Sequence, residues 1–339
     1  MKAVVISKFG AADVLEVRDW PEREPGPGEV KLRTRFAGVN FADIAARIGI
    51  YKDAPKPPCV VGYEVSGVVL AVGAGVKHVS VGDRALGLTM FGGYAGEVCT
   101  LADAVRRIPD AMSDEEAAAL PVNYLTAYHM LSYLTTVRPR DRVLIHAAAG
   151  GVGIAAIQLA RAAGAEIFGT ASPGKHDYLR SIGVAHCIDY RATDFAEEVS
   201  RLTHGEGVDI VLDALGGADL AKSARCLRQG GRLFTFGFSR ASGETRNLFK
   251  IIGELLRMPK WRPLGLMDRN HAVLGVNMNH LAAERPDVIA HELDALLKLY
   301  VMGTIRPKVD RVFPIAEAAD AHRFLQARQN VGKVLLKFA

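Results

Sequence analysis

Cysteine is scarce in this chain, and its spacing excludes several classes of protein. Among the 339 residues there are four cysteines, Cys59, Cys99, Cys187 and Cys226, and no two of them form a C-x-x-C pair. This spacing does not suit a disulfide framework, a zinc ribbon or an iron–sulfur site. We therefore expect a protein of a reducing compartment, the cytoplasm.

Long apolar runs and tracts of basic residues are also missing. Residues Met1–Lys8 contain too short an apolar core for a signal peptide. Val143–Ala160 spans 18 residues without a formal charge, but its three glycines within four positions indicate a buried strand, turn and helix rather than a membrane span. The formal net charge of +5 comes without a Lys/Arg-rich tract, so we expect no nucleic-acid partner.

The composition that is present is that of a globular protein, with 49% hydrophobic and 23% charged residues. The length allows two domains. Short β-like runs, separated by glycine and proline, fill the first third of the chain, at Met1–Ser7, Glu29–Ala37, Val65–Val72, Arg84–Leu88 and Tyr94–Leu101. Together with a short helix at Phe41–Arg47, they predict a compact β-barrel domain.

The pattern changes after Ser113, which with Glu116 forms a capping box at the start of a helix. Strands are then predicted, with helical segments between them, at Arg142–Ala147, Glu166–Thr170, Val184–Asp189, Val208–Asp213, Arg232–Gly237 and Ala272–Val276. This alternation is typical of a doubly wound parallel sheet. After a helix at Ile289–Leu299, the strands at Val309–Phe313 and Lys333–Phe338 return to the first domain. The expected division is 1–123 with 299–339, and 124–298.

A glycine-rich turn follows the first strand of the second domain. Gly150 and Gly153 hold the second and third places of a G-x-G-x-x-G pattern, and Ala148 replaces its first glycine. Glycines at a strand–helix junction let the backbone approach a pyrophosphate, whose charge then meets the N–H groups of the helix. We interpret the turn as a dinucleotide site; the alternative is a purely structural turn.

The residues after the second strand of this domain favour NADPH over NADH. An NAD site has Asp or Glu about 20 residues past the turn, to bind the ribose hydroxyls. Here Gly169–Lys175 contains no acid, and Ser172 and Lys175 provide a hydroxyl and an ammonium for a 2′-phosphate. The alternative is a helix-capping serine beside a solvated lysine.

Several motifs resemble those of one family, in order along the whole chain. Ala37–Asp43 contains a G-V-N-x-x-D signature, followed by Arg47–Tyr51, Gly62–Gly67, Thr126–Tyr128, Ala147–Gly153 and Asn330–Val334. They resemble the zinc-independent quinone oxidoreductase branch of the medium-chain dehydrogenases/reductases. Pro263–Leu281 is similar to the synaptic-vesicle membrane protein homologues within that branch.

The resemblance implies a GroES-like catalytic domain, a Rossmann domain, a cleft between them and a homodimer. It also implies cofactor roles for matching residues. Gly150, Gly151, Val152 and Gly153 would form the pyrophosphate turn, and Ser172, Lys175 and Tyr190 would hold the 2′-phosphate. Asn40, Thr126 and Gly237 would lie near the nicotinamide, and Asn330 and Lys333 would close the cofactor cleft.

Two substitutions separate the chain from the zinc-dependent members of that superfamily. Those enzymes have Cys where Asn40 stands and His where Tyr63 stands beside Glu64, and their structural zinc needs several cysteines where this chain has only Cys99. We therefore expect no metal. Without a Lewis acid, reduction of a quinone or an α,β-unsaturated carbonyl is the easier reaction, because the conjugated substrate delocalises the charge.

The candidate hydrogen-bond donors to the developing enolate are Asn40, Tyr51 and Tyr63, with the ribose hydroxyls and water as rivals. For each tyrosine, a packed ring whose hydroxyl meets a backbone group is an equally good interpretation. Asp43 is expected to orient the loop of Asn40. His129 and His146 lie in apolar runs without nearby acids, which is typical of core histidines.

Residues 240–271 form a segment that is both basic and apolar, with seven basic and three acidic side chains and a local charge of +4. A basic amphipathic helix with Trp261 could lie in an anionic lipid interface. The alternative, which we favour, is a helix that covers the substrate cleft or a dimer partner. This segment supports a rival function: an NADPH-binding module with little turnover that docks to a membrane or protein. A zinc alcohol dehydrogenase is the other rival, disfavoured by Asn40 and Tyr63.

Overall fold

The computed structural model describes residues 1–239, 243, 245 and 247–338, so Arg240 and Arg246 of the basic apolar segment lie outside the described residues. The chain divides into two units. The first unit comprises Met1–Leu125, Gly243–Arg246 and Met278–Ala339, and the second comprises Thr126–Ser242 and Asn247–Asn277. Among the described residues, no helix has the length and apolar character that crossing a membrane requires.

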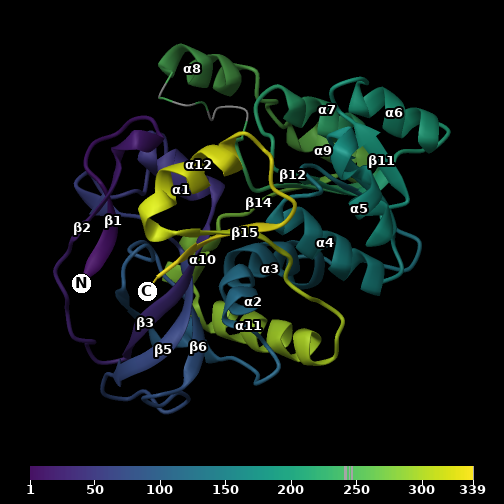
Figure 1. Cartoon of the computed structure of the whole chain (residues 1–339). Helices are drawn as coiled ribbons and strands as arrows, with labels where there is room; N and C mark the ends of the chain where they lie inside the picture. Colours follow the sequence, from purple (N-terminus) through teal and green to yellow (C-terminus); the bar gives the residue numbers. More distant parts are fainter. Residues whose placement is uncertain (240–242, 244, 246, 339) are drawn as a thin grey trace. The chain divides into compact units, whose positions relative to one another are not determined.

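The first unit is built on a seven-stranded sheet with the order β15-β16-β3-β5-β6-β8, in which β7 also pairs with β3. Figure 1 labels β3, β5, β6 and β15 of this sheet. Its strands are β3 (Glu29–Val39), β5 (Glu64–Val72), β6 (Arg84–Leu88), β7 (Glu97–Leu101), β8 (Val105–Arg107), β15 (Val309–Pro314) and β16 (Lys333–Lys337). A smaller sheet joins β2 (Leu15–Asp19), β1 (Lys2–Ile6) and β4 (Cys59–Val60). The predicted β-rich domain is confirmed.

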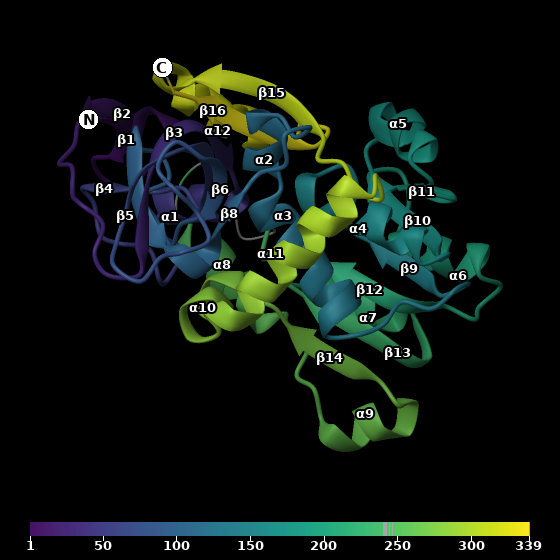
Figure 2. The ribbon, with the colours of Figure 1, turned by 90° about the horizontal axis from the view of Figure 1, so that it is seen from below.

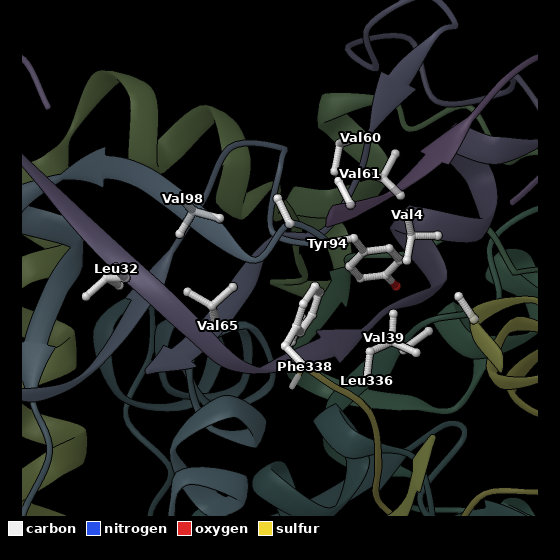
Figure 3. Packing of buried hydrophobic residues seen from close by; sticks show 14 of the residues in the cluster. Val4, Leu32, Val39, Val60, Val61, Val65, Tyr94, Val98, Leu336 and Phe338 are labelled. Carbon is white, nitrogen blue, oxygen red and sulfur yellow. The ribbon is translucent and has the colours of Figure 1, made fainter. Parts of the chain in front are cut away.

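The core of this unit is mostly aliphatic, and the ring of Tyr94 lies within it. Figure 3 shows the ring of Tyr94 among Val4, Val39, Val61 and Phe338. The strand β3 runs to Val39, two residues beyond the predicted end, because Val39 and Gly38 pair with Val334 and Leu335 of β16. The C-terminal strand therefore completes the sheet that the first third of the chain begins.

The helices of the first unit are α1 (Phe41–Arg47), α2 (Asp114–Ala119), α10 (Met278–Glu284), α11 (Pro286–Val301) and α12 (Ala318–Gln326); α3 (Pro121–Tyr128) spans the boundary between the two units. The capping box of Ser113 and Glu116 is present at the start of α2. Arg106 binds both Asp294 (2.6 Å) and the carbonyl of Ala290 (3.1 Å) on α11. These contacts are within the first unit, whose last stretch is Met278–Ala339.

The second unit contains a parallel sheet of six strands with the order β11-β10-β9-β12-β13-β14. The strands are β9 (Arg142–Ile145), β10 (Glu166–Ala171), β11 (His186–Asp189), β12 (Val208–Asp213), β13 (Leu227–Thr235) and β14 (Ala272–Gly275). The order reverses at β9, whose neighbours are β10 and β12. This is the doubly wound sheet that the alternating pattern predicts, and ligands bind such sheets at the carboxyl ends of the strands beside the reversal.

The helices of the second unit are α4 (Gly151–Ala162), α5 (His176–Ser181), α6 (Phe195–Leu202), α7 (Asp219–Arg225), α8 (Leu248–Leu256) and α9 (Pro263–Arg269). Helix α4 packs on β9 and β10, and α7 packs on β12 and β13. Figure 2 shows β14 at one edge of this sheet, with α9 beyond its end.

Candidate functional site

The second unit carries the glycine turn between β9 and α4. Ala147 has a positive φ of 50°, and its carbonyl accepts a hydrogen bond from the N–H of Gly150 at 2.8 Å. A Cβ at Gly153 would lie 2.4 Å from the carbonyl oxygen of Ala148 and 2.6 Å from that of Ala147. Since no side chain fits there, Gly153 permits the close packing of helix on strand that a dinucleotide turn requires.

Helix α4 begins directly after this turn, at Gly151. Its N-cap is Gly150, which has no side chain to accept from the N–H groups of the first turn. The partial positive charge of a twelve-residue helix is therefore presented at Gly150, Gly151 and Val152. An anionic pyrophosphate group is the kind of ligand that such a helix start binds.

The residues predicted for the 2′-phosphate follow two neighbouring strands. Ala171 of β10 pairs with Asp189 of β11, so Ser172 and Tyr190 come directly after adjacent strand ends. Lys175 closes the short turn that begins after Ser172, and both side chains are half-buried. Arg191, which the sequence analysis did not single out, places its guanidinium 5.8 Å from the centre of the Tyr190 ring.

The remaining predicted residue after a strand end is Gly237, which follows β13. A Cβ at Gly237 would lie 2.7 Å from the carbonyl oxygen of Ala214, so the chains after β12 and β13 approach closely there. Thr126 is buried in α3. Both residues belong to the second unit.

His146, which directly precedes the glycine turn, belongs to a chain of buried polar groups. Ser223 donates to Asp213 at 2.5 Å, so its oxygen accepts from Nε2 of His146 at 3.0 Å, and Nδ1 accepts from Thr170 at 3.1 Å. Burial lowers the pKa of His146, with the charge of Asp213 opposing that shift. The residue is the hydrogen-bonded core histidine that we expected.

In the first unit, Asn40 lies at the end of β3 among buried charges. Its Oδ1 accepts from Nζ of Lys333 at 2.6 Å, and its Nδ2 donates to Oε1 of Glu64 at 3.0 Å and to the carbonyl of Gly38 at 3.3 Å. Lys333 and Glu64 also form an ion pair, with 3% and 0% of their side chains exposed. The ammonium predicted to close a cofactor cleft is therefore directed into the interior of this unit.

Asn330, the other residue predicted beside the cofactor, is also buried in the first unit. Its Nδ2 donates to the carbonyl of Gly332 at 2.7 Å. Gly332 has a φ of 102°, and a Cβ there would lie 2.3 Å from the carbonyl oxygen of Lys308. Asn330 thus stabilises the turn that leads into β16.

Asp43 holds the loop of Asn40, as expected, and a second loop as well. Its carboxyl oxygens accept from the N–H groups of Asn40 (2.7 Å) and Gly62 (2.9 Å) and from the hydroxyl of Tyr94 (2.9 Å). Burial raises the pKa of Asp43 to about 7, although these hydrogen bonds and the charge of Lys333 act in the opposite direction. Tyr94 also contacts Nε2 of His322 at 3.3 Å.

The two predicted tyrosines lie side by side in the first unit. The rings of Tyr51 and Tyr63 are 6.2 Å apart edge to face, and Phe91 lies 5.1 Å from Tyr63. Tyr63 is 2% exposed, and within the described chain its hydroxyl has no hydrogen-bond partner. Burial, followed by the charge of Asp43, raises the pKa of Tyr63, so this hydroxyl stays neutral and can donate a hydrogen bond to an oxygen.

Asn279 is a residue that the sequence analysis missed as part of this group. Its Nδ2 donates to the hydroxyl of Tyr51 at 3.0 Å. The two residues are 228 positions apart, and only the return of α10 to the first unit brings them together. No local motif around Asn279 pointed to this contact.

A seven-stranded β unit and a doubly wound unit with a glycine turn define a class, the medium-chain dehydrogenases/reductases. Two family models match the chain: the alcohol dehydrogenase GroES-like domain over residues 26–110 and zinc-binding dehydrogenase over residues 182–336. The human synaptic vesicle membrane protein VAT-1 homolog is 41% identical over 340 residues, which covers 99% of this chain and 86% of that protein. The chain therefore belongs to the medium-chain dehydrogenase/reductase superfamily, in the quinone oxidoreductase branch with the VAT-1 homologs.

Solved structures agree with this assignment. The Escherichia coli quinone oxidoreductase complexed with NADPH has a TM-score of 0.88 at 28% identity, and the match covers 100% of both chains. The CurK enoyl reductase has a TM-score of 0.86 at 32% identity, with coverage of 100% of this chain and 99% of that one. The chain is thus an oxidoreductase-family member with neighbours that include quinone and enoyl reductases.

The description of one family model includes zinc, and the residues of this chain do not fit that metal. A catalytic zinc needs thiolate, imidazole or carboxylate ligands. Asn40 and Tyr63 offer an amide and a neutral hydroxyl, and Glu64 is paired with Lys333. Within the described ranges, no group of three or more His, Cys, Asp or Glu side chains could hold a metal ion.

Proposed function

We propose that the protein is a zinc-independent, NADPH-dependent reductase of quinones or α,β-unsaturated carbonyls. The observation that carries this proposal is the donor set of the first unit, where Asn40 and Tyr63 replace metal ligands and Glu64 binds a lysine. Such a set cannot polarise a simple carbonyl through a metal. It suits a conjugated carbonyl, which needs only a hydrogen bond to the oxygen on which charge develops.

The second unit supports NADPH as the cofactor. Gly150, Gly151, Val152 and Gly153 form a pyrophosphate turn, and Ser172, Lys175 and Tyr190 follow adjacent strand ends without a carboxylate at the end of β10. Two cationic side chains, Lys175 and Arg191, suit a 2′-phosphate. Thr126, Gly237 and Asn40 are the further cofactor contacts that we propose, whereas Lys333 is engaged by Asn40 and Glu64, and Asn330 by the carbonyl of Gly332.

In the reaction, bound NADPH supplies the hydride. The chain positions the acceptor and donates a hydrogen bond to its carbonyl oxygen as negative charge develops there. Tyr63 supports this role best, because its buried hydroxyl has no partner in the described chain and retains its proton. Tyr51, oriented by Asn279, is the second candidate. The aromatic rings of both residues and of Phe91 favour a flat, conjugated acceptor.

We further propose a cytoplasmic homodimer. β14 is an edge strand of its sheet, and an edge strand exposes N–H and C=O groups to which a second chain can pair. The four cysteines are free thiols, in keeping with a reducing compartment.

A screen of NADPH oxidation tests the proposed activity. Purified protein is assayed with quinones, enones and enals, and NADH serves as the control cofactor. We expect turnover with at least one conjugated acceptor and a preference for NADPH. Binding of NADPH without turnover of any acceptor would contradict the reductase proposal and favour the rival of a binding module.

Exposed apolar residues on two helices of the second unit favour that rival as a second candidate. Phe249 and Leu256 of α8 are 91% and 81% exposed, and Leu264 and Met267 of α9 are exposed too. Arg257, Lys260, Arg262 and Arg269 are exposed in the same stretch. Apolar side chains beside basic ones are the composition of a surface that binds anionic lipids.

Flotation with anionic vesicles at low salt tests this second candidate. Recovery of the protein with the vesicles, lost in a Phe249→Ser/Leu256→Ser variant, would support membrane docking. Val81→Ser is the matched control, because Val81 is an exposed apolar residue of the first unit. The absence of recovery for the unaltered protein would rule the candidate out.

A further inference from the structure

Helix α12 and strand β15 of the first unit line an open cavity to which no residue of the candidate functional site contributes. Figure 2 shows the two elements next to each other. The cavity has a volume of about 290 Å³, and its walls include Arg311 and Phe313 of β15 and Arg323 and Phe324 of α12. Small-molecule sites usually measure about 300–1,000 Å³, so this cavity suits a small ligand built around a single ring.

The guanidinium of Arg311 is held over two aromatic rings in this cavity. Its Cζ lies 4.8 Å from the centre of the Phe324 ring and 5.6 Å from that of the Phe313 ring, and the two ring centres are 5.9 Å apart. Both distances from the cation are within the roughly 6 Å over which a cation–π contact is attractive. Because these contacts already restrict the side chain, a ligand that binds it causes a smaller loss of conformational entropy.

Arg311 differs from its neighbour Arg323 in its charge partners. Arg323 forms ion pairs with Asp13 and Asp320. Arg311 is exposed, and in the part of the chain that the structure describes its guanidinium takes part in no ion pair and no hydrogen bond. Its N–H donors are therefore open to a ligand. A carboxylate matches the fork of a guanidinium with two parallel hydrogen bonds.

The remaining walls determine what kind of acid fits. Phe324 is half-buried and lines the cavity, so a flat apolar group can pack on its ring. Asp320 also lines the cavity, and although Arg323 pairs with it, its negative charge opposes a doubly charged group such as a phosphate. A singly charged carboxylate on a flat ring satisfies both conditions.

β15 is an edge strand of its sheet, but its residues do not favour the addition of a peptide strand. It carries the exposed charges of Asp310 and Arg311 and ends at Pro314. Charged side chains and proline are features with which edge strands avoid pairing. The cavity is therefore better suited to a small molecule than to an extended peptide.

We propose that β15 and α12 form a binding site for a small aromatic carboxylate. The carboxylate binds the guanidinium of Arg311, and the ring packs on Phe324. This proposal goes beyond the reductase function and does not rest on it, because every residue that it uses belongs to the first unit and it invokes no contact with NADPH.

Calorimetric titration of the complete protein with benzoate, in the absence of NADPH, tests the site. We expect a dissociation constant of about 1 mM or lower, which is typical of a good ligand of this size. Benzamide lacks the charge and acetate lacks the ring, so each should bind at least about tenfold more weakly. Benzamide that binds as tightly as benzoate would contradict the role of the guanidinium.

Three variants locate the bound benzoate. Arg311→Gln removes the charge and should weaken benzoate binding about tenfold or more. Arg311→Lys keeps the charge but not the fork, so it should recover only part of that loss. Phe324→Leu should weaken benzoate binding about threefold, because it removes the aromatic face.

Arg18→Gln is the matched control, since Arg18 is an exposed cation of the same unit that pairs with Glu16 and does not line the cavity. It should bind benzoate as the wild type does. Equal benzoate affinity in the wild type and in Arg311→Gln would overturn the proposal, because the ligand would then bind elsewhere. No binding to the wild type at about 10 mM benzoate would overturn it as well.

Discussion

At the scale of the residue, Asp43 holds together the loops that carry two candidate site residues. Its carboxyl group accepts from the N–H groups of Asn40 and Gly62, and the next residue after Gly62 is Tyr63. The sequence placed Asp43 near Asn40 because they lie three positions apart. Only the fold showed that the same carboxyl group also fixes the loop before Tyr63.

The raised pKa of Asp43 makes its contribution to stability depend on pH. Burial raises this pKa from 3.8 to about 7, so the folded protein binds the proton more tightly than the unfolded chain does. The stabilisation is complete below about pH 4 and is lost as the pH rises through about 7. The thermal midpoint of the wild type should therefore fall between pH 4 and 7 relative to that of Asp43→Asn.

Comparison with the variant removes the contribution of other groups that titrate in this range, such as His146 and His322, whose pKa values burial lowers. The variant should be less stable at every pH, because an amide cannot accept all the hydrogen bonds of Asp43. Curves of thermal midpoint against pH that run parallel for the two proteins would contradict the shift.

Lys175 is the residue on which cofactor preference should depend. Lys175→Ala removes an ammonium proposed to bind the 2′-phosphate, and a hydrogen bond to a charged group contributes about 1.5–3 kcal/mol. The NADPH dissociation constant should rise about 10- to 100-fold, while that of NADH changes little. Calorimetric titration with both cofactors measures the difference.

Arg180→Ala is the matched control, because Arg180 is an exposed cation on α5 that pairs with Asp177. It should leave both dissociation constants unchanged. Equal losses of NADPH and NADH affinity in Lys175→Ala would remove the argument for 2′-phosphate recognition.

At the scale of the element, the local sequence pattern predicted both the type and the bounds of several helices and strands. The helix Phe41–Arg47 and the strands Arg84–Leu88 and Val208–Asp213 match the sequence analysis residue for residue. β13 begins five residues before its predicted start, because Leu227 pairs with Val208 across an irregularity in the ladder. The ends of such strands are set by pairing between distant segments. The local sequence pattern contains no information on that pairing.

The start of α4 is the part of an element that a single substitution should disturb most. Gly153→Ala places a Cβ 2.4 Å from a backbone oxygen of the turn, which must then open. We expect a loss of about 1–3 kcal/mol in the free energy of unfolding. Because the turn is displaced, NADPH affinity should fall as well; denaturant unfolding and fluorescence titration check both.

Gly265→Ala provides the control for that substitution. Gly265 lies in α9, and a Cβ there would meet nothing within 4 Å. It should raise the free energy of unfolding by up to about 1 kcal/mol, through helix propensity alone. A Gly153→Ala variant as stable as this one would contradict the packing argument.

At the scale of the whole molecule, the chain leaves the first unit and returns to complete it. β16 lies between β15 and β3, so the sheet begun near residue 29 is finished only after residue 333. The second unit, in contrast, is mostly one stretch, in which strands and helices alternate along the chain.

The chemistry proposed for the molecule needs no metal, which gives a prediction for the complete protein. Dialysis against EDTA should leave the NADPH-dependent reductase activity and the thermal midpoint unchanged, because Asn40, Tyr63 and the paired Glu64 do not form a zinc site. Activity assays and metal analysis before and after dialysis check this. Loss of activity that added zinc restores would contradict the metal-free reaction.

The sequence by itself determined the two-part architecture, the glycine turn and the lack of an acid after β10. Each of these features depends on residues that lie close together in the sequence. Tertiary structure alone decided the surroundings of Asn40: Lys333 contacts it from 293 positions away, and Asn279 reaches Tyr51 across 228. The physical reason is that strand pairing and helix docking set the distance between remote side chains. A motif records the residues of its own segment and contains no information on which distant strand will lie beside it.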